Sequence, residues 1–330
     1  MNEAVAAYLD AVSSGDRTAA LEVVRRARDS GLTPLDVMSD VVGAAQLRIG
    51  ELWAADRWSV AQEHAATAVS ESVVAVLAAE IADPAPGGAA VVVSCVEQEW
   101  HALPALLVAE HLRADGLPVS YLGANASAEH LVRHVHETAP RAVALSCSLS
   151  ASLPLVRRQV EAVRATGTPV VVGGSAFDGE GRRARAIGAT AYARTGRDAV
   201  GVVRGLPTAV SPADPLTHEG AVEGQGVYAD REDLTAALRA RVAEAYPLGD
   251  GAELLPGWQQ ALTDHLSHLV GSVSAALLTG DRTVVVEGAV WLRSVMDHRE
   301  APSGVTERVL GELRRLLAEH PEATRVLAAV

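Results

Sequence analysis

The chain has 330 residues, 49% of them hydrophobic and 21% charged, which is enough for packed cores in two or three domains of ordinary size. Its formal net charge of −13 argues against a nucleic-acid partner, because phosphate binding needs a clustered positive surface. The sequence contains no apolar run long enough to cross a membrane and no N-terminal pattern of a signal peptide, so we expect a cytoplasmic protein.

Residues 1–82 show helical apolar spacing throughout. The pattern predicts helices over residues 3–12, from Asp16 onward, over residues 34–55 and over residues 59–82. The connections between these runs are short, which favours an antiparallel four-helix bundle. The segment DPAPGG at residues 83–88 ends the helical pattern and predicts a linker.

The period of the pattern changes at residue 89. Five short strand-like runs follow, AAVVVSC, PVSYLG, AVALSCS, PVVVGGS and TAYARTG, and they alternate with helical segments. Over residues 89–206 this predicts a flavodoxin-like, doubly wound, five-stranded parallel sheet. The ligand site of such a sheet lies at the carboxyl ends of its strands, where the strand order reverses. The loop after the first strand, residues 96–104, is therefore the first place to expect chemistry.

Residues 207–229 are rich in Pro, Gly and small polar residues and read as a second linker. From residue 230 the helical spacing returns, with runs at residues 231–246, 255–279, 281–297 and 303–319 and a short helix after Pro321. Residues 230–330 are thus predicted to form an all-helical domain. The whole chain is a multidomain protein of α and α/β parts.

Two features of composition restrict the chemistry. Cys95 and Cys147 are the only cysteines, and both lie in apolar strand-like runs, so we expect two buried, reduced thiols and no disulfide. The sequence has no lysine, which excludes a cofactor or pigment held as a lysine Schiff base.

A polar set follows three of the predicted strands: Glu99, Trp100, His101, Ser146, Ser148, Gly173 and Gly174. Taken alone, each is more simply a surface or packing residue. Together they resemble the cobalamin-binding signature of methionine synthase and its relatives, D-x-H-x-x-G followed by S-x-L and G-G. The chain departs from it at Glu99 for the acid, Pro104 for the glycine and Ser148 for the leucine. A glutamate in the first position also occurs in the light-sensing branch of that family.

The resemblance implies that His101 is the lower axial ligand of cobalt and replaces the cofactor's own dimethylbenzimidazole. Its second ring nitrogen then needs a fixed acceptor, which Glu99 can supply. The displaced nucleotide tail needs a slot floored by small and hydroxylated residues. Besides the serines and glycines above, the end of the second strand should border it, at Tyr121, Leu122 and Gly123.

The N-terminal segment carries a second pattern. Trp53 is followed by nine residues and then by Glu63 and His64. This W-x9-EH spacing is similar to the cap over the upper face of adenosylcobalamin in B12 photoreceptors of the light-dependent repressor type. The resemblance implies that Trp53 covers the adenosyl group while Glu63 and His64 contact its sugar and base. Those photoreceptors have a histidine directly after the tryptophan, whereas this chain has Ala54, so that position cannot ligate cobalt after illumination.

The order of a capped B12 domain and an all-helical segment resembles the photocobilins, photoreceptors that also bind biliverdin. A bilin needs aromatic walls, a polar group near its pyrrole nitrogens and cations for its propionates. The candidate residues on the predicted helices are Trp258, His265, His268, Trp291 and Arg293. No cysteine follows Cys147, so a bilin in this domain would be held without a covalent bond. Ordinary helix packing would explain each of these residues equally well.

The sequence therefore favours a light sensor that binds adenosylcobalamin and biliverdin, is not an enzyme, and changes its homo-oligomeric assembly or its contact with a partner protein. One alternative is a corrinoid methyl-carrier protein, although Trp53 would obstruct the open upper face that a carrier needs. Another is a B12 sensor with a single chromophore, whose C-terminal helices form a dimerisation module. A mutase subunit is less favoured, because the chain has no barrel-like substrate domain.

Overall fold

A computed structural model describes residues 2–82, 84, 87–247 and 255–330. Residues 83, 85 and 86 of the linker predicted at 83–88 lie outside the described residues. The chain divides into two compact units. The first contains Met1–Ser146, Ala162–Gly174 and Thr190–Ser211, and the second contains Cys147–Glu161, Ser175–Ala189 and Pro212–Val330. Within the described part of the chain, no helix combines the length and apolarity needed to traverse a bilayer.

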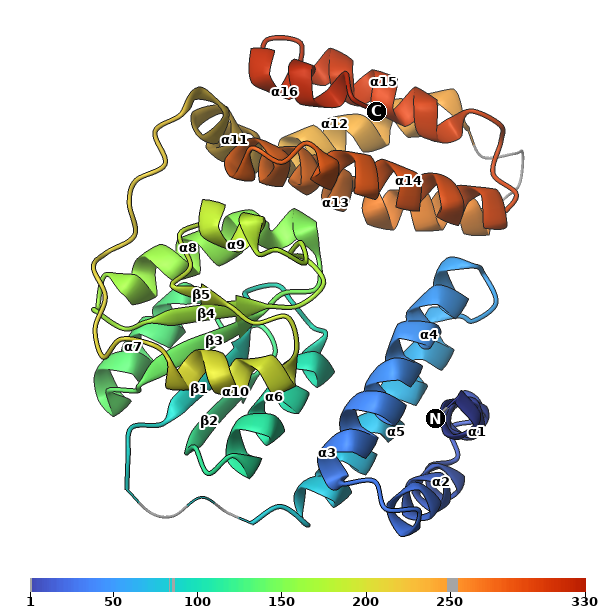
Figure 1. Cartoon of the computed structure of the whole chain (residues 1–330). Coiled ribbons are helices and arrows are strands. Elements are labelled where there is room, and N and C mark those ends of the chain that lie inside the picture. The colour runs from blue at the N-terminus through green and yellow to red at the C-terminus, as the bar shows by residue number, and fades with distance from the viewer. Residues whose placement is uncertain (1, 83, 85–86, 248–254) are drawn as a thin grey trace. The chain divides into compact units, whose positions relative to one another are not determined.

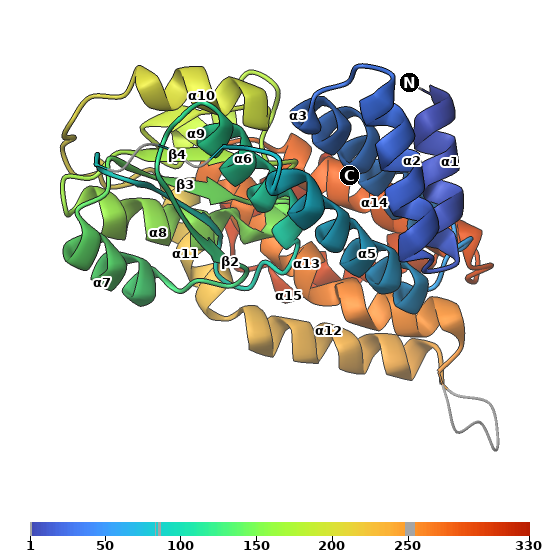
Figure 2. The same cartoon turned by 90° about the horizontal axis from the view of Figure 1, so that it is seen from below.

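All four helical runs predicted for the N-terminal segment are present, and they lie alongside one another in Figure 2. The helices are α1 (Asn2–Ser13), α2 (Arg17–Asp29), α3 (Pro34–Asp36) continuing through the π-helical stretch η1 (Val37–Gly43) into α4 (Ala44–Ala54), and α5 (Val60–Ala78). Helices α2 and α5 have side-chain N-caps. Asp16 caps α2 by accepting a hydrogen bond from the backbone N–H of Ala19, and Ser59 caps α5 by accepting one from the backbone N–H of Gln62. The π stretch is a departure from the single regular helix that we predicted over residues 34–55.

The core of this bundle extends beyond its own four helices. Tyr8, Met38 and Ile49 are completely or almost completely buried in it. Leu103 belongs to the same cluster, and Leu106 and Leu107 pack against it. These three leucines come from α6 (Ala102–Ala114), the first helix of the α/β part. Bundle and sheet therefore share one helix.

The α/β part contains the predicted five-stranded parallel sheet (Figure 1). Its strands are β1 (Val91–Cys95), β2 (Val119–Gly123), β3 (Ala142–Ser146), β4 (Val170–Gly173) and β5 (Ala191–Tyr192). The order β2-β1-β3-β4-β5 is the flavodoxin-like order, so the predicted fold class is confirmed. Between the strands run α7 (Ala128–Thr138), the 3-10 turn η2 (Ser150–Ser152), α8 (Leu153–Arg164) and α9 (Arg182–Ala186), and α10 (Gly196–Arg204) follows β5.

The sheet aligns the ends of its central strands. Cys95 of β1 is in register with Ser146 of β3, and Ser146 is in register with Gly173 of β4. The order reverses at β1, which has β2 on one side and β3 on the other. The loops after β1, β3 and β4 therefore start from one edge of the sheet, at its topological switch point.

Six helices make up the C-terminal part: α11 (Glu219–Ala229), α12 (Arg231–Ala245), α13 (Gly257–Thr279), α14 (Thr283–His298), α15 (Val305–Leu316) and α16 (Pro321–Leu327). They lie together, from dark yellow to red, in Figure 1. The segment predicted as a linker at 207–229 ends in α11, which is a difference from the prediction. Gly224 explains it, because a Cβ there would lie 3.1 Å from the carbonyl oxygen of Ser274. The glycines that favoured a loop instead let α11 pack closely on α13.

Candidate functional site

The loop after β1 holds its histidine in one orientation. The buried Glu99, which is 1% exposed, accepts hydrogen bonds from the backbone N–H of His101, at 3.1 Å, and from Nδ1 of the same residue. The backbone N–H of Asn125 donates to the carbonyl of Glu99 at 3.0 Å, which fixes the loop to the chain beyond β2. The imidazole remains 53% exposed, with Nε2 as the nitrogen available to a ligand. Nδ1 is assigned as the protonated nitrogen because its partner is a carboxylate.

Charge around this histidine is negative. The hydrogen bond that His101 donates to Glu99 raises the pKa of His101, desolvation by burial opposes that rise, and the carboxylate charges of Glu99 and Glu63 add to it. An imidazole with a carboxylate behind it is a more basic donor at its other nitrogen, which is the arrangement found around metal-ligating histidines. Sequence reasoning identified the Glu99–His101 pair and its acceptor role, but not the contribution of Glu63.

The ends of the neighbouring strands add small and polar groups. Ser146 and Gly173 stand side by side, as their register requires. A Cβ on Gly173 would lie 2.6 Å from the carbonyl oxygen of Ala193, so only glycine fits there. Gly174 adopts φ = 104°, a left-handed conformation that also favours glycine. Ser148 follows β3 by two residues and lies in the segment Cys147–Glu161, which belongs to the second unit.

The end of β2 borders the same loop. The hydroxyl of Tyr121 donates to the carbonyl of Ala102, directly after His101, at 3.1 Å. Ser94 donates to the carbonyl of Gly123 at 3.3 Å. Leu122 lies between them on the strand and is partly buried. Trp100 differs from its neighbours, because it is 72% exposed and large.

The three bundle residues of the W-x9-EH pattern lie at the end of α4 and the start of α5. Trp53 is half-buried in the last turn of α4. Glu63 accepts hydrogen bonds from Nδ1 of its neighbour His64, at 2.6 Å, and from Thr67, at 3.4 Å. His64 is 73% exposed. Since the charge of Glu63 raises the pKa of His101, this end of the bundle lies close enough to the β1 loop to act on its histidine.

Family comparisons agree with this geometry. Two models, each described as a B12 binding domain, match residues 89–204 and residues 4–78. The chain carries a B12-binding domain pair. The first match covers the sheet with its strand-end loops, and the second covers the bundle. The cofactor is accordingly a cobalamin or another corrinoid.

The fold occurs in a solved corrinoid protein. A monomethylamine corrinoid protein from Methanosarcina barkeri aligns with a TM-score of 0.53 at 18% identity, over 61% of this chain and 97% of that one. A cobalamin-binding protein from Desulfitobacterium hafniense DCB-2 aligns at 22% identity over 60% of this chain and 96% of that one, with a TM-score of 0.33. A methanol:cobalamin methyltransferase complex from Methanosarcina barkeri gives 17% identity, 62% and 81% coverage and a TM-score of 0.33. Among curated proteins, none matches the chain.

The residues of the B12-binding pair suit a corrinoid. One exposed imidazole with a buried carboxylate behind it is a donor for a single axial position. Gly173, at the end of β4, stands in register with Ser146, so that small residues end both strands. His101 would thus ligate cobalt, and Ser146, Gly173 and Gly174 would border the nucleotide tail.

The structure brings together three of the five residues proposed for a bilin. The rings of His265 and His268 on α13 are 5.4 Å apart, and the ring of Trp291 on α14 lies 4.9 Å from that of His265. Desolvation lowers the pKa of His265, against a hydrogen bond to the carbonyl of Ala261 that raises it. His265 is therefore a neutral ring at neutral pH.

The other two residues have different neighbours. Trp258 packs edge-on against Tyr246 of α12, with ring centroids 5.3 Å apart. Arg293 forms an ion pair with Glu307 at 2.9 Å. Helical spacing alone placed Trp258 and Arg293 with the histidines, whereas Trp258 contacts Tyr246 at the end of α12 and Arg293 contacts Glu307 of α15.

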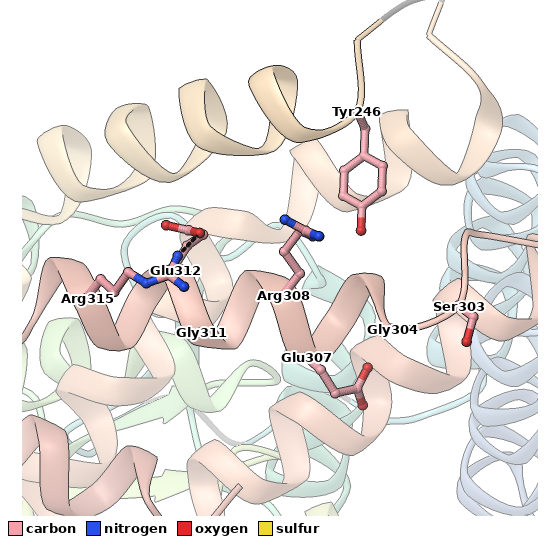
Figure 3. Close-up of a pocket in the computed structure, with 8 residues that line it drawn as sticks. All are labelled: Tyr246, Ser303, Gly304, Glu307, Arg308, Gly311, Glu312 and Arg315. Atoms are coloured by element: carbon pink, nitrogen blue, oxygen red, sulfur yellow. Dashed lines mark hydrogen bonds and ion pairs between the residues drawn. The ribbon is translucent and has the colours of Figure 1, made fainter.

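Two open grooves line the C-terminal helices. One, of about 430 Å³, lies beside α15, where Arg308 faces the ring of Tyr246 at 5.8 Å and Glu312 pairs with Arg315 (Figure 3). The other, of about 400 Å³, is lined in part by Arg293, Met296 and Ser303. Neither groove is lined by His265, His268 or Trp291.

Proposed function

We propose that this protein is a light sensor that holds adenosylcobalamin through His101 and covers its upper face with Trp53. The observation that supports the proposal is that the bundle packs on α6, the helix directly after His101, with Leu103 buried in the bundle core. The carboxylate charge of Glu63 in the W-x9-EH pattern also raises the pKa of His101. When bound, adenosylcobalamin supplies a Co–C bond that visible light breaks. Glu99 orients the imidazole, and the bundle excludes water from the upper face. The protein itself is not an enzyme, and its output is a change in homo-oligomeric assembly or in contact with a partner protein.

A direct test is to load the protein with adenosylcobalamin in the dark and to compare absorption and hydrodynamic size before and after illumination. A sensor should show a cobalamin spectrum with histidine ligation and a change of oligomeric state upon illumination. Free adenosylcobalamin, illuminated in the same buffer, controls for photolysis that does not need the protein. An unchanged hydrodynamic size would contradict the sensor.

The second candidate is a corrinoid methyl carrier, and the fold it shares with the monomethylamine corrinoid protein favours it. A carrier must expose the upper face of its cofactor to partner enzymes. Preferential binding of methylcobalamin over adenosylcobalamin, together with no response to light, would support this candidate and exclude the sensor.

Trp53 distinguishes the two candidates. Trp53→Ala should reduce the preference for adenosylcobalamin over methylcobalamin by about 2–4 kcal/mol, because a large aromatic contact with the adenosyl group is lost. The two dissociation constants are measured by titration in the dark. Trp58→Ala is the matched control, since Trp58 packs against the bundle core and should cost stability without changing the preference. Equal preference in the parent and in Trp53→Ala would show that Trp53 does not cover the ligand.

A second chromophore is proposed for the C-terminal helices. His265, His268 and Trp291 offer an aromatic and imidazole surface for biliverdin, bound without a covalent bond. Adding biliverdin to the full chain should give a red-shifted, structured band, and acid denaturation should release free pigment. Trp291→Ala should abolish the band, while Trp258→Ala should retain it, because Trp258 packs against Tyr246. If the parent gives only the spectrum of free pigment, these helices are a dimerisation module.

A further inference from the structure

Arg183 is a buried cation that is not among the residues assigned above to the cobalamin site or to the bilin cluster. It lies on the short helix α9 and is 3% exposed, whereas its neighbour Arg182 is 66% exposed. Burying a guanidinium is costly unless carboxylates and further hydrogen bonds satisfy it. The contacts that Arg183 makes within the second compact unit therefore indicate the role of its side chain.

One half of the guanidinium faces the C-terminal helices. Its Nε donates to Asp281, before α14, at 2.8 Å. One Nη donates to Thr283 at 3.0 Å and to both carboxylate oxygens of Glu287 at 2.9 Å. Desolvation raises the pKa of Asp281, but hydrogen bonds from Thr283 and Arg183 outweigh it and hold that pKa below its ordinary value. Asp281 is thus an anion that stabilises the buried cation.

The other half of the guanidinium faces two loops. The second Nη donates to the carbonyl of Ala176 at 3.2 Å and reaches the hydroxyl of Ser150 at 3.5 Å. Ser150 lies in the loop that continues from β3, and Ala176 lies in the loop that continues from β4. These loops also bind each other, because Ser175 donates to the carbonyl of Ser148 at 2.9 Å.

A second contact joins the C-terminal helices to the loop after β3. A Cβ on Gly271 of α13 would lie 2.9 Å from the carbonyl oxygen of Ala151 and 3.0 Å from its Cβ. Helix α13 therefore packs directly on η2. The two loops that begin at Ser148 and Gly174, where we place the nucleotide tail, are supported from the C-terminal helices at two points.

We propose that Arg183 is a positioning residue of the cobalamin site, through which the C-terminal helices hold the loops after β3 and β4 in the shape that receives the nucleotide tail. The inference rests on the proposed function. It gives the C-terminal helices a role in cofactor affinity that does not depend on a second pigment. By linkage, binding of the tail stabilises these helices to the same extent as they favour its binding.

The test compares two corrinoids, cobalamin and cobinamide, which lacks the nucleotide tail. In the full chain, Arg183→Met should raise the Kd of cobalamin by about tenfold and leave that of cobinamide within about twofold. Arg183→Lys should restore part of the loss, because an ammonium can still pair with Asp281 or Glu287 but cannot make the whole set of contacts.

Arg157→Met is the matched control. Arg157 is also buried, at 4% exposed, and binds Glu161 and the carbonyls of Ile187 and Asp214. Its loss should lower the thermal stability of the protein as Arg183→Met does, without changing the ratio of the two affinities. A merely structural role for Arg183 would make the two variants behave alike.

The outcomes separate the inference from the proposed function. If the parent binds neither corrinoid, the proposed function is wrong. If the parent binds cobalamin and Arg183→Met weakens both corrinoids equally, or neither, the inference is overturned. Should Arg183→Met fail to fold, Glu287→Gln weakens the same contact more gently. It should still raise the Kd of cobalamin relative to cobinamide, and an unchanged ratio would overturn the inference.

Discussion

Replacing His101 with alanine is expected to raise the Kd of cobalamin by at least about a hundredfold, since loss of a residue that only orients a metal ligand already costs about 10–100-fold. Any cobalamin that still binds should lack the absorption features of histidine ligation. The reason is the geometry of the loop: the buried Glu99 accepts a hydrogen bond from Nδ1 of His101, which leaves Nε2 of His101 as the nitrogen available to cobalt. The change is measured by titration followed by absorption spectroscopy.

Two further variants make this result specific. Glu99→Gln keeps an oxygen that can accept from Nδ1, so its effect should be smaller, about tenfold. His136→Ala removes an exposed histidine of α7 and should leave both affinity and spectrum unchanged. Histidine-ligated cobalamin in His101→Ala would show that another residue provides the axial ligand.

Gly173→Ala should destabilise the protein without cofactor by about 2–3 kcal/mol, which is the usual cost of forcing an extra carbon into a packed position. Its Cβ would lie 2.6 Å from the backbone oxygen of Ala193, and a backbone atom cannot move aside as a side chain can. Strands β4 and β5 would have to separate, which would disturb the backbone hydrogen bond from Ala193 to Val172. Urea unfolding measures the loss.

The control for this substitution is Gly201→Ala. Gly201 lies inside α10 with no atom within 4 Å of an added Cβ, so alanine there should stabilise the helix by up to about 1 kcal/mol. The two glycines should therefore respond with opposite signs. Equal urea midpoints for the parent and Gly173→Ala would mean that the strand end has room for a side chain.

The sequence predicted most of the fold because apolar periodicity is strong in this chain. The short apolar runs located all five strands, and Ser127 caps α7 where the helical pattern begins. Helix α11 was missed for a physical reason. Its glycines have a low helix propensity, and only their close packing on α13 makes that helix favourable.

The site was predictable only where neighbours in sequence act together. Glu99 and His101 are two residues apart, so the sequence contains their interaction. Arg183 belongs to the run RRAR, which has the composition of a solvent-exposed segment, and the carboxylates that pair with it, Asp281 and Glu287, lie about 100 residues away. Trp258 and Arg293 show the complementary error, because helical spacing places side chains on a face but does not say which helix that face meets.

Because α6 contributes to the core of the bundle, it affects when the bundle can fold during synthesis. The buried core of the bundle includes Leu103, which the ribosome adds well after the last residue of α5. A nascent chain that ends at residue 82 lacks this part of its core, and the apolar surface that α6 would cover remains in water. The bundle therefore completes its packing only when synthesis has passed α6, and by then β1 and His101 have also been made. The last part of the bundle core and the loop that holds His101 thus become available for folding at the same stage of translation.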